Sequence, residues 1–205
     1  MNFLHSFYIF FCRSIFPSSF TFSDFKEKIQ NLEEIQINFS ETNSEEAVEN
    51  ILYHGFHLGV IRFPEIMEDN TLRMLQQKKL RYRPIWTFDY MLLTSRQSAL
   101  AALDKVHPEN LKGYTELVHG DVNSQFDFLS NVPTTYMWVS PLPEKVLRQH
   151  ELVQIPCPDN RYRYRDILIY HEDYPFTGYE EQFYNILLQT RDEIEKSSNL
   201  SGRLG

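Results

Sequence analysis

The stretch that decides the fold is 35-IQINFSETNSEEAVENILYHGFHLGVIRFP-64. Apolar side chains alternate over Glu34–Phe39, which predicts a strand with one apolar face. The period then changes, and apolar residues at helical spacing predict a helix that opens at Thr42–Ser44 and stops at Gly55. The run Phe56–Arg62 is apolar and predicts a further strand.

The start of this helix offers two alternative capping boxes. Thr42 can pair with Glu45, or Asn43 can pair with Glu46, because each pair places a capping side chain three residues before a glutamate. The sequence leaves this choice open.

Upstream, Phe7–Cys12 is continuously apolar, as expected for a strand covered on both faces. Phe22, Phe25, Ile29 and Leu32 follow at helical spacing. Strand, helix, strand, helix and strand at such short intervals predict right-handed crossovers and a parallel sheet.

Downstream, a helix is expected over Asn70–Gln77, and Leu80–Thr94 is too long for one ordinary strand. We interpret it as a strand that crosses into a second lobe. The expected fold is α/β with a second lobe that interrupts the first: residues 1–91 with 170–205 form one lobe, and residues 92–169 form the other. Further helices are expected over Ala99–Val106, Ser124–Leu129, Pro143–His150 and from Thr177–Glu180, and strands over Tyr114–His119, Thr134–Val139, Leu152–Pro156 and Asp166–His171.

Composition restricts the function. The 205 residues are 42% hydrophobic and carry a net charge of −8, so the chain can bury a core but should not bind DNA unaided. Cys12 and Cys157 are isolated, which favours reduced thiols and a cytoplasmic location. An export signal is rejected, because Arg13 is the first basic residue and it follows the apolar run.

The chain lacks GxGxxG, GxxxxGK[ST], HExxH and GxSxG motifs, so no cofactor and no catalysis are expected. His54 and His57 are separated by Gly55, which argues against a helical metal pair. We therefore expect no metal site and no catalytic residue.

Polar residues follow the strand ends, where an open parallel sheet binds its ligands. They are Arg13, Ser14 and Ile15 after the first strand, Glu41–Ser44 after the second, and Arg62 after the third. Each has an ordinary alternative: Ser14 and Ser44 as helix caps, Asn43 in an Asx turn, Arg62 as a solvated strand end. Their convergence would form a site for a carboxylate or another anion.

The order of these segments resembles the effector-binding domain of LysR-type transcription regulators. The resemblance starts with Ile35–Pro64 and continues through "LRYRPIWTFDYMLLTSRQSALA" (Leu80–Ala101) and "HPENLKGYTELVHGD" (His107–Asp121). It ends with "LVQIPCPD" and "RDILIYHEDYPFTGYEEQFYNIL". Nearly the whole chain is covered, by motifs that are individually degenerate.

The resemblance implies two Rossmann-like lobes in a type 2 periplasmic-binding-protein-like fold, with a small effector between the lobes. The effector contacts it implies are Arg13, Ser14, Ile15, Asn43, Ser44, Arg62, Thr94 and Ser95. It also implies a homodimer or tetramer in which Ser19–Ile29 of one subunit packs against a second-lobe helix, Ser124–Leu129, of another. The winged helix-turn-helix that would contact DNA is absent from this sequence.

Two other functions fit parts of the pattern. A free-standing solute-binding protein would share the two lobes but needs an export signal. An α/β enzyme would need a catalytic group that no motif here identifies.

Overall fold

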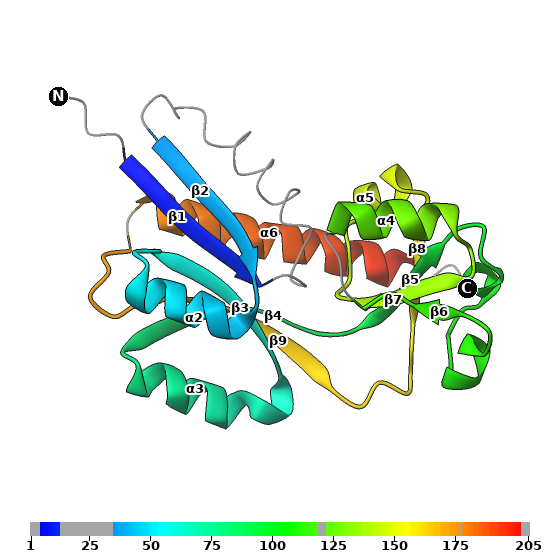
Figure 1. Ribbon diagram of the computed structural model, residues 1–205, viewed down its shortest axis with the longest axis horizontal. Helices are drawn as coiled ribbons and strands as arrows, with labels where there is room; N and C mark the ends of the chain where they lie inside the picture. The colour runs from blue at the N-terminus through cyan, green and yellow to red at the C-terminus, as the bar shows by residue number, and fades with distance from the viewer. Residues whose placement is uncertain (1–4, 13–34, 119–121, 177, 202–205) are drawn as a thin grey trace. The chain divides into compact units, whose positions relative to one another are not determined.

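A computed structural model describes residues 5–12, 35–118, 122–176 and 178–201. The chain divides into two compact units, each with its own sheet (Figure 1). The first unit comprises Met1–Thr87 and Tyr164–Arg191, and the second comprises Phe88–Arg163 and Asp192–Gly205. The lobe boundaries expected from the sequence stay predictions.

The first unit is built on a five-stranded sheet. Its elements are β1 (His5–Cys12), β2 (Ile35–Thr42), α2 (Ser44–Tyr53), β3 (Leu58–Pro64), a 3-10 turn at Glu65–Met67, α3 (Glu68–Gln77), β4 (Leu80–Asp89), β9 (Arg163–His171) and the start of α6 (Gly178–Ser201).

The strands of this sheet follow the order β2-β1-β3-β9-β4. β1 pairs in parallel with β2 and with β3, with Phe7 opposite Ile37 and Phe10 opposite Gly59. These pairings confirm the parallel arrangement predicted for the first three strands. β9 is inserted antiparallel to β3, so the late part of the chain fills an inner position of the sheet.

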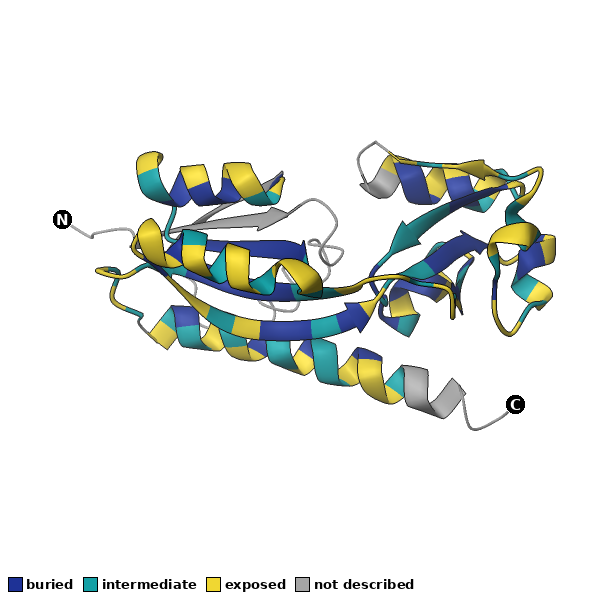
Figure 2. Cartoon of the chain, turned by 90° about the horizontal axis from the view of Figure 1, so that it is seen from below, coloured by how far each residue is buried: buried dark blue, intermediate teal, exposed yellow. Residues whose placement is uncertain are grey.

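Helices cover both faces of the first sheet (Figure 2). α2 and α3 bury Ala47, Val48, Ile51 and Leu75 against side chains of β3, β4 and β9. α2 lies so close to β3 that a Cβ on Gly59 would be 3.0 Å from Ile51 Cδ1. α6 covers the opposite face (Figure 2) and buries Phe183, Ile186 and Leu187.

The second unit has a four-stranded sheet made of β5 (Met91–Ser95), β6 (Thr115–Glu116), β7 (Thr135–Val139) and β8 (Leu152–Pro156), in the order β6-β7-β5-β8. β5 is antiparallel to β7 and to β8, and β6 is parallel to β7. Leu92 packs with Leu100 and Val106 in one buried cluster. The other elements are 3-10 turns at Ala99–Ala102 and Pro108–Leu111, α4 (Val122–Asn131) and α5 (Glu144–Gln149).

Three element predictions need correction. The helix expected over Ala99–Val106 is wrong, because Ser98 caps only one 3-10 turn and Leu103 is already extended (φ −92°, ψ 135°). The strand expected from Phe56 begins at Leu58, after Gly55 takes a positive φ of 71°. The strand expected over Tyr114–His119 is the two-residue β6 within the described residues.

Among the described helices, none has an apolar stretch long enough to cross a bilayer.

Candidate functional site

The N-terminus of α2 lies at the end of β2, where the sequence places polar residues. Asn43 is the N-cap, with extended backbone (φ −86°, ψ 169°), and its Oδ1 accepts from the Glu46 N–H at 2.9 Å. The Thr42 hydroxyl donates to the Glu46 carboxylate. Of the two capping alternatives, the structure therefore forms the pair Asn43 and Glu46. The Glu46 carboxylate is held by Thr42.

Ser44 bonds to the backbone of β3. Its Oγ donates to the Arg62 carbonyl at 2.9 Å and accepts from the Arg62 N–H at 3.1 Å. The β1–β3 ladder ends at Val60, so beyond that point the Ser44 hydroxyl takes the place of a neighbouring strand. The cap role weighed for Ser44 belongs to Asn43, and Ser44 joins α2 to β3.

The side chain of Arg62 is buried in an ion pair with Asp166 of β9. Nε lies 2.8 Å from Oδ1 and Nη2 lies 2.8 Å from Oδ2, and the two side chains are only 3% and 0% exposed. Burial raises the pKa of Asp166, and the Arg62 charge and hydrogen bonds oppose that rise. The alternative of a solvated strand end is wrong for Arg62. Its guanidinium links β3 to β9, and an effector would meet it already occupied by a carboxylate.

Thr94 and Ser95 lie at the end of β5 in the second unit and are almost fully buried. The Thr94 hydroxyl donates to the Thr135 carbonyl at 2.8 Å, which ties β5 to the start of β7. The Ser95 hydroxyl accepts from the Gln97 N–H at 3.2 Å and closes a turn. Both hydroxyls therefore have structural partners within their own unit.

The structure brings together part of the predicted site. Asn43, Ser44 and Arg62 form one bonded cluster in the first unit, and Thr94 and Ser95 are neighbours in the second. Arg13, Ser14 and Ile15 lie outside the described residues, as does the predicted dimer helix Ser19–Ile29. The other predicted dimer segment, Ser124–Leu129, is helical and lies in α4.

Sequence reasoning missed Asp166. This residue is 104 positions from Arg62 in the chain, and nothing next to it in sequence marks it as the partner of a buried arginine. The weak available signal was an acidic residue in front of the apolar run Ile167–Ile169, which is unusual for a strand buried on both faces.

The charge around the α2 N-terminus is mixed. Backbone amides of a first helical turn attract anions. Glu45 and Glu46 already place negative charge in this turn, while the exposed side-chain amide of Asn43 can donate a hydrogen bond. This edge therefore suits a ligand that accepts hydrogen bonds, and it is less favourable for a strongly charged anion.

A second polar cluster lies at the other end of β3. The ring of His57 stacks on Tyr174, with centroids 4.6 Å apart, and the Tyr174 hydroxyl donates to the buried Glu180 carboxylate. Burial lowers the pKa of His57 despite the charge of Glu180, and burial together with this hydrogen bond raises the pKa of Tyr174. The described residues contain no group of three or more side chains placed to hold a metal ion.

Comparison with known proteins supports the architecture through structure alone. No protein-family model matches the chain, and no curated protein matches its sequence. Solved structures do match. Oxidised OxyR from Corynebacterium glutamicum superposes with a TM-score of 0.64 and 8% identity, covering 98% of this chain and 68% of that one.

Two further structures align over nearly their whole length. Reduced OxyR from N. meningitidis has a TM-score of 0.63 and 10% identity, with 91% of this chain and 96% of that chain covered. The reduced regulatory domain of OxyR2 from Vibrio vulnificus has a TM-score of 0.59 and 10% identity, with 94% of this chain and 97% of that chain covered. The fold is the type 2 periplasmic-binding-protein-like fold. The predicted fold class is thereby confirmed.

Proposed function

We propose that this chain is the ligand-sensing domain of a LysR-type transcription regulator and has no catalytic activity. It binds a small effector between its two lobes and assembles with further copies of itself, and a separate head outside this sequence contacts DNA in the cytoplasm. The observation that carries the proposal is the structural likeness to OxyR regulatory domains, which covers 91% to 98% of the chain.

The geometry of the first unit supports the position of the effector site. Parallel strands β1, β2 and β3 place their carboxyl ends at one edge, which is where open α/β sheets bind ligands. Asn43 opens α2 at this edge and is exposed. Because Ser44 and Arg62 are bonded to protein groups, we assign them the role of holding this edge in shape. Asn43 is the residue of this cluster that contacts the effector.

The full proposed effector site keeps the residues implied by the family resemblance: Arg13, Ser14, Ile15 and Asn43 contact the effector, and Ser44, Arg62, Thr94 and Ser95 position them. The buried hydroxyls of Thr94 and Ser95 act by positioning the end of β5. An effector that prefers one arrangement of the lobes shifts the regulator toward that arrangement by its difference in affinity.

The proposal is tested with a panel of small organic acids and neutral polar metabolites, by thermal shift and then by calorimetry. The informative variant is Asn43→Asp, which keeps the helix cap but replaces the amide donor by a carboxylate. Because this change removes a hydrogen bond to a charged group, an organic acid should bind the variant about tenfold more weakly, or weaker still. Asn70→Asp is the matched control, because it makes the same charge change at an exposed position of α3.

The expected result is a hit whose affinity falls in Asn43→Asp and is unchanged in Asn70→Asp. If no compound in the panel binds, or if the two variants bind alike, the sensor site is not at this edge. Assembly is tested separately by sedimentation equilibrium, where a strictly monomeric chain at high concentration would contradict the proposed self-association.

A further inference from the structure

A basic segment lies apart from the proposed effector site. Between Asn70 and Phe88 the sequence contains five lysines and arginines and no aspartate or glutamate, in a chain whose net charge is −8. The five are Arg73, Lys78, Lys79, Arg81 and Arg83. They lie on the second half of α3, on the turn after it and on the first half of β4.

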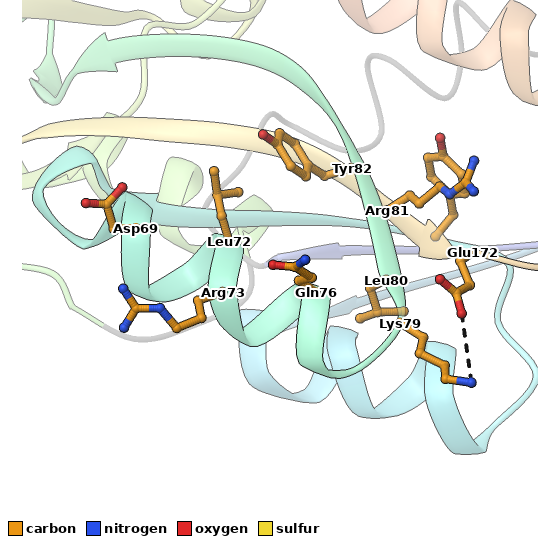
Figure 3. A pocket seen from close by; sticks show the side chains of 10 residues that line it. Asp69, Leu72, Arg73, Gln76, Lys79, Leu80, Arg81, Tyr82 and Glu172 are labelled. Carbon is orange, nitrogen blue, oxygen red and sulfur yellow. Dashed lines mark ion pairs between the residues drawn. The ribbon is translucent and has the colours of Figure 1, made fainter.

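A groove of about 640 Å³ lies between α3 and β4, and all its lining residues belong to the first unit (Figure 3). Leu72 and Tyr82 supply apolar surface, and Tyr82 is 43% exposed. Arg73, Lys79 and Arg81 supply the charge at its rim. β4 is the outermost strand of its sheet, so the groove follows a sheet edge.

The groove lining carries more positive than negative charge, with Arg73, Lys79 and Arg81 set against Asp69 and Glu172. Arg83 is paired with Glu181 at 2.8 Å and lies against the ring of Phe176, and it is not one of the lining residues. Lys79 makes only a long, exposed contact of 3.9 Å with Glu172. Within the part of the chain that the structure describes, Arg73 and Arg81 form no ion pair. The groove therefore attracts anionic groups.

The arrangement of these groups selects among anionic ligands. In Figure 3 the charged ends of Arg73, Lys79 and Arg81 point to separate places along the groove, so they do not converge on one compact anion. Asp69 and Glu172 also line it and repel any negative charge placed beside them. A phosphate backbone carries a charge at every nucleotide and cannot avoid them, whereas a peptide can keep its carboxylates at the cations. An extended peptide with separated carboxylates and apolar side chains matches the spaced cations, Leu72 and Tyr82.

We propose that the groove between α3 and β4 binds an extended acidic segment of a partner protein, with glutamate or aspartate side chains at Arg73 and Arg81 and an apolar side chain against Leu72 and Tyr82. This site is independent of the effector edge, because none of its residues belongs to the Asn43, Ser44 and Arg62 cluster. It gives the domain a second, protein-directed binding surface.

The test uses fluorescence anisotropy with a fluorescein-labelled peptide of eight residues in which glutamate alternates with leucine. A second peptide has glutamine in place of every glutamate. The full chain is titrated as wild type, as Arg73→Gln/Arg81→Gln, and as Lys105→Gln/Lys112→Gln. The last variant is the matched control, because it removes two exposed cations from the second unit and changes the net charge equally.

Each exposed ion pair contributes modestly, so the double change at the groove should weaken binding about fivefold or more, and the control less than about twofold. The acidic peptide should bind more tightly than the glutamine peptide, and added salt should reduce the difference. Circular dichroism melting curves establish that both variants fold like the wild type.

Three results would overturn the proposal. The first is equal binding of the acidic and glutamine peptides, and the second is equal affinity of the groove variant and the control. The third is tighter binding of a short DNA duplex than of the acidic peptide, together with weaker binding of that duplex to the groove variant than to the wild type. Sedimentation of the chain alone adds a fourth, since an oligomer that dissociates only in the groove variant would identify a second copy of this chain as the occupant.

Discussion

Ser44 and Arg62 are joined by two hydrogen bonds that run in opposite directions, between the Ser44 hydroxyl and the backbone N–H and C=O of Arg62. Ser44 Oγ donates to the Arg62 carbonyl and accepts from the Arg62 N–H, at 2.9 and 3.1 Å. A strand neighbour would satisfy the same two backbone groups. The hydroxyl thus supports the part of β3 that extends past its pairing with β1.

Ser44→Ala removes both bonds and leaves two backbone groups of a buried residue without this partner. Such a loss costs about 1–3 kcal/mol of unfolding free energy. Urea denaturation of Ser44→Ala and of Ser44→Thr, which keeps the hydroxyl, measures the effect. A serine-to-alanine change that costs less than about 0.5 kcal/mol would show that the bonds are not structural.

The buried pair of Arg62 and Asp166 predicts strong non-additivity. Arg62→Met or Asp166→Leu alone leaves an unpaired buried charge and should cost about 3–5 kcal/mol. The double variant has no charge to bury, so it should be more stable than either single variant. A double-mutant cycle in guanidinium chloride measures the coupling, and additive single effects would contradict a direct pair.

Gly59 lies where α2 packs closely on β3, so an added side chain there meets its neighbours. In Gly59→Ala the new methyl would lie 3.0 Å from Ile51 Cδ1 and 3.3 Å from Ile169 Cγ1. Overpacking of this kind costs about 1–3 kcal/mol. Adding Ile51→Val should restore part of the loss in a thermal melt, and no recovery would mean that the strain arises elsewhere.

His57 predicts a dependence of stability on pH. Burial lowers its pKa in the native state, so in acid the unfolded chain binds more protons than the native chain. Its contribution is present above the ordinary histidine value of about 6.5 and is lost as pH falls from there toward the lowered native pKa. His57→Phe retains a ring against Tyr174 and should flatten the fall in unfolding free energy between pH 7.5 and 5.

The control for this measurement is His54→Gln, which removes an exposed histidine three residues away. In His54→Gln the unfolding free energy should fall between pH 7.5 and 5 as it does in the wild type. Equal slopes for His57→Phe and the wild type would show that another group governs the response to acid.

Local periodicity was enough to predict much of the first unit. Helical spacing over Ala47–Leu52 reflects one buried face, and α2 forms there. The alternation over Ile35–Phe39 likewise falls on a strand, β2. The same reasoning failed for Ala99–Val106, which is rich in helix-forming alanine and leucine. Leu100 and Val106 are both buried in the core of the second unit. The chain places them there with one 3-10 turn followed by extended backbone at Leu103.

The candidate site was predictable only in part. Asn43 as a cap follows from local spacing, because its partner Glu46 lies three residues away. The state of Arg62 depends on Asp166, and no local rule connects residues 104 positions apart. Strand ends can therefore be located from the sequence. To predict which residue pairs with a charged side chain at such an end, one must know the order of the strands in the sheet.

The strand order also determines when the first sheet can be completed during synthesis of the chain. β9 lies between β3 and β4, yet it is made only after every strand of the second sheet. A nascent chain can complete the second sheet while the position between β3 and β4 in the first sheet is still unfilled, and before Asp166, the partner of Arg62, has been synthesised. Until residue 171 leaves the ribosome, two strand edges stay available to chaperones and to wrong partners.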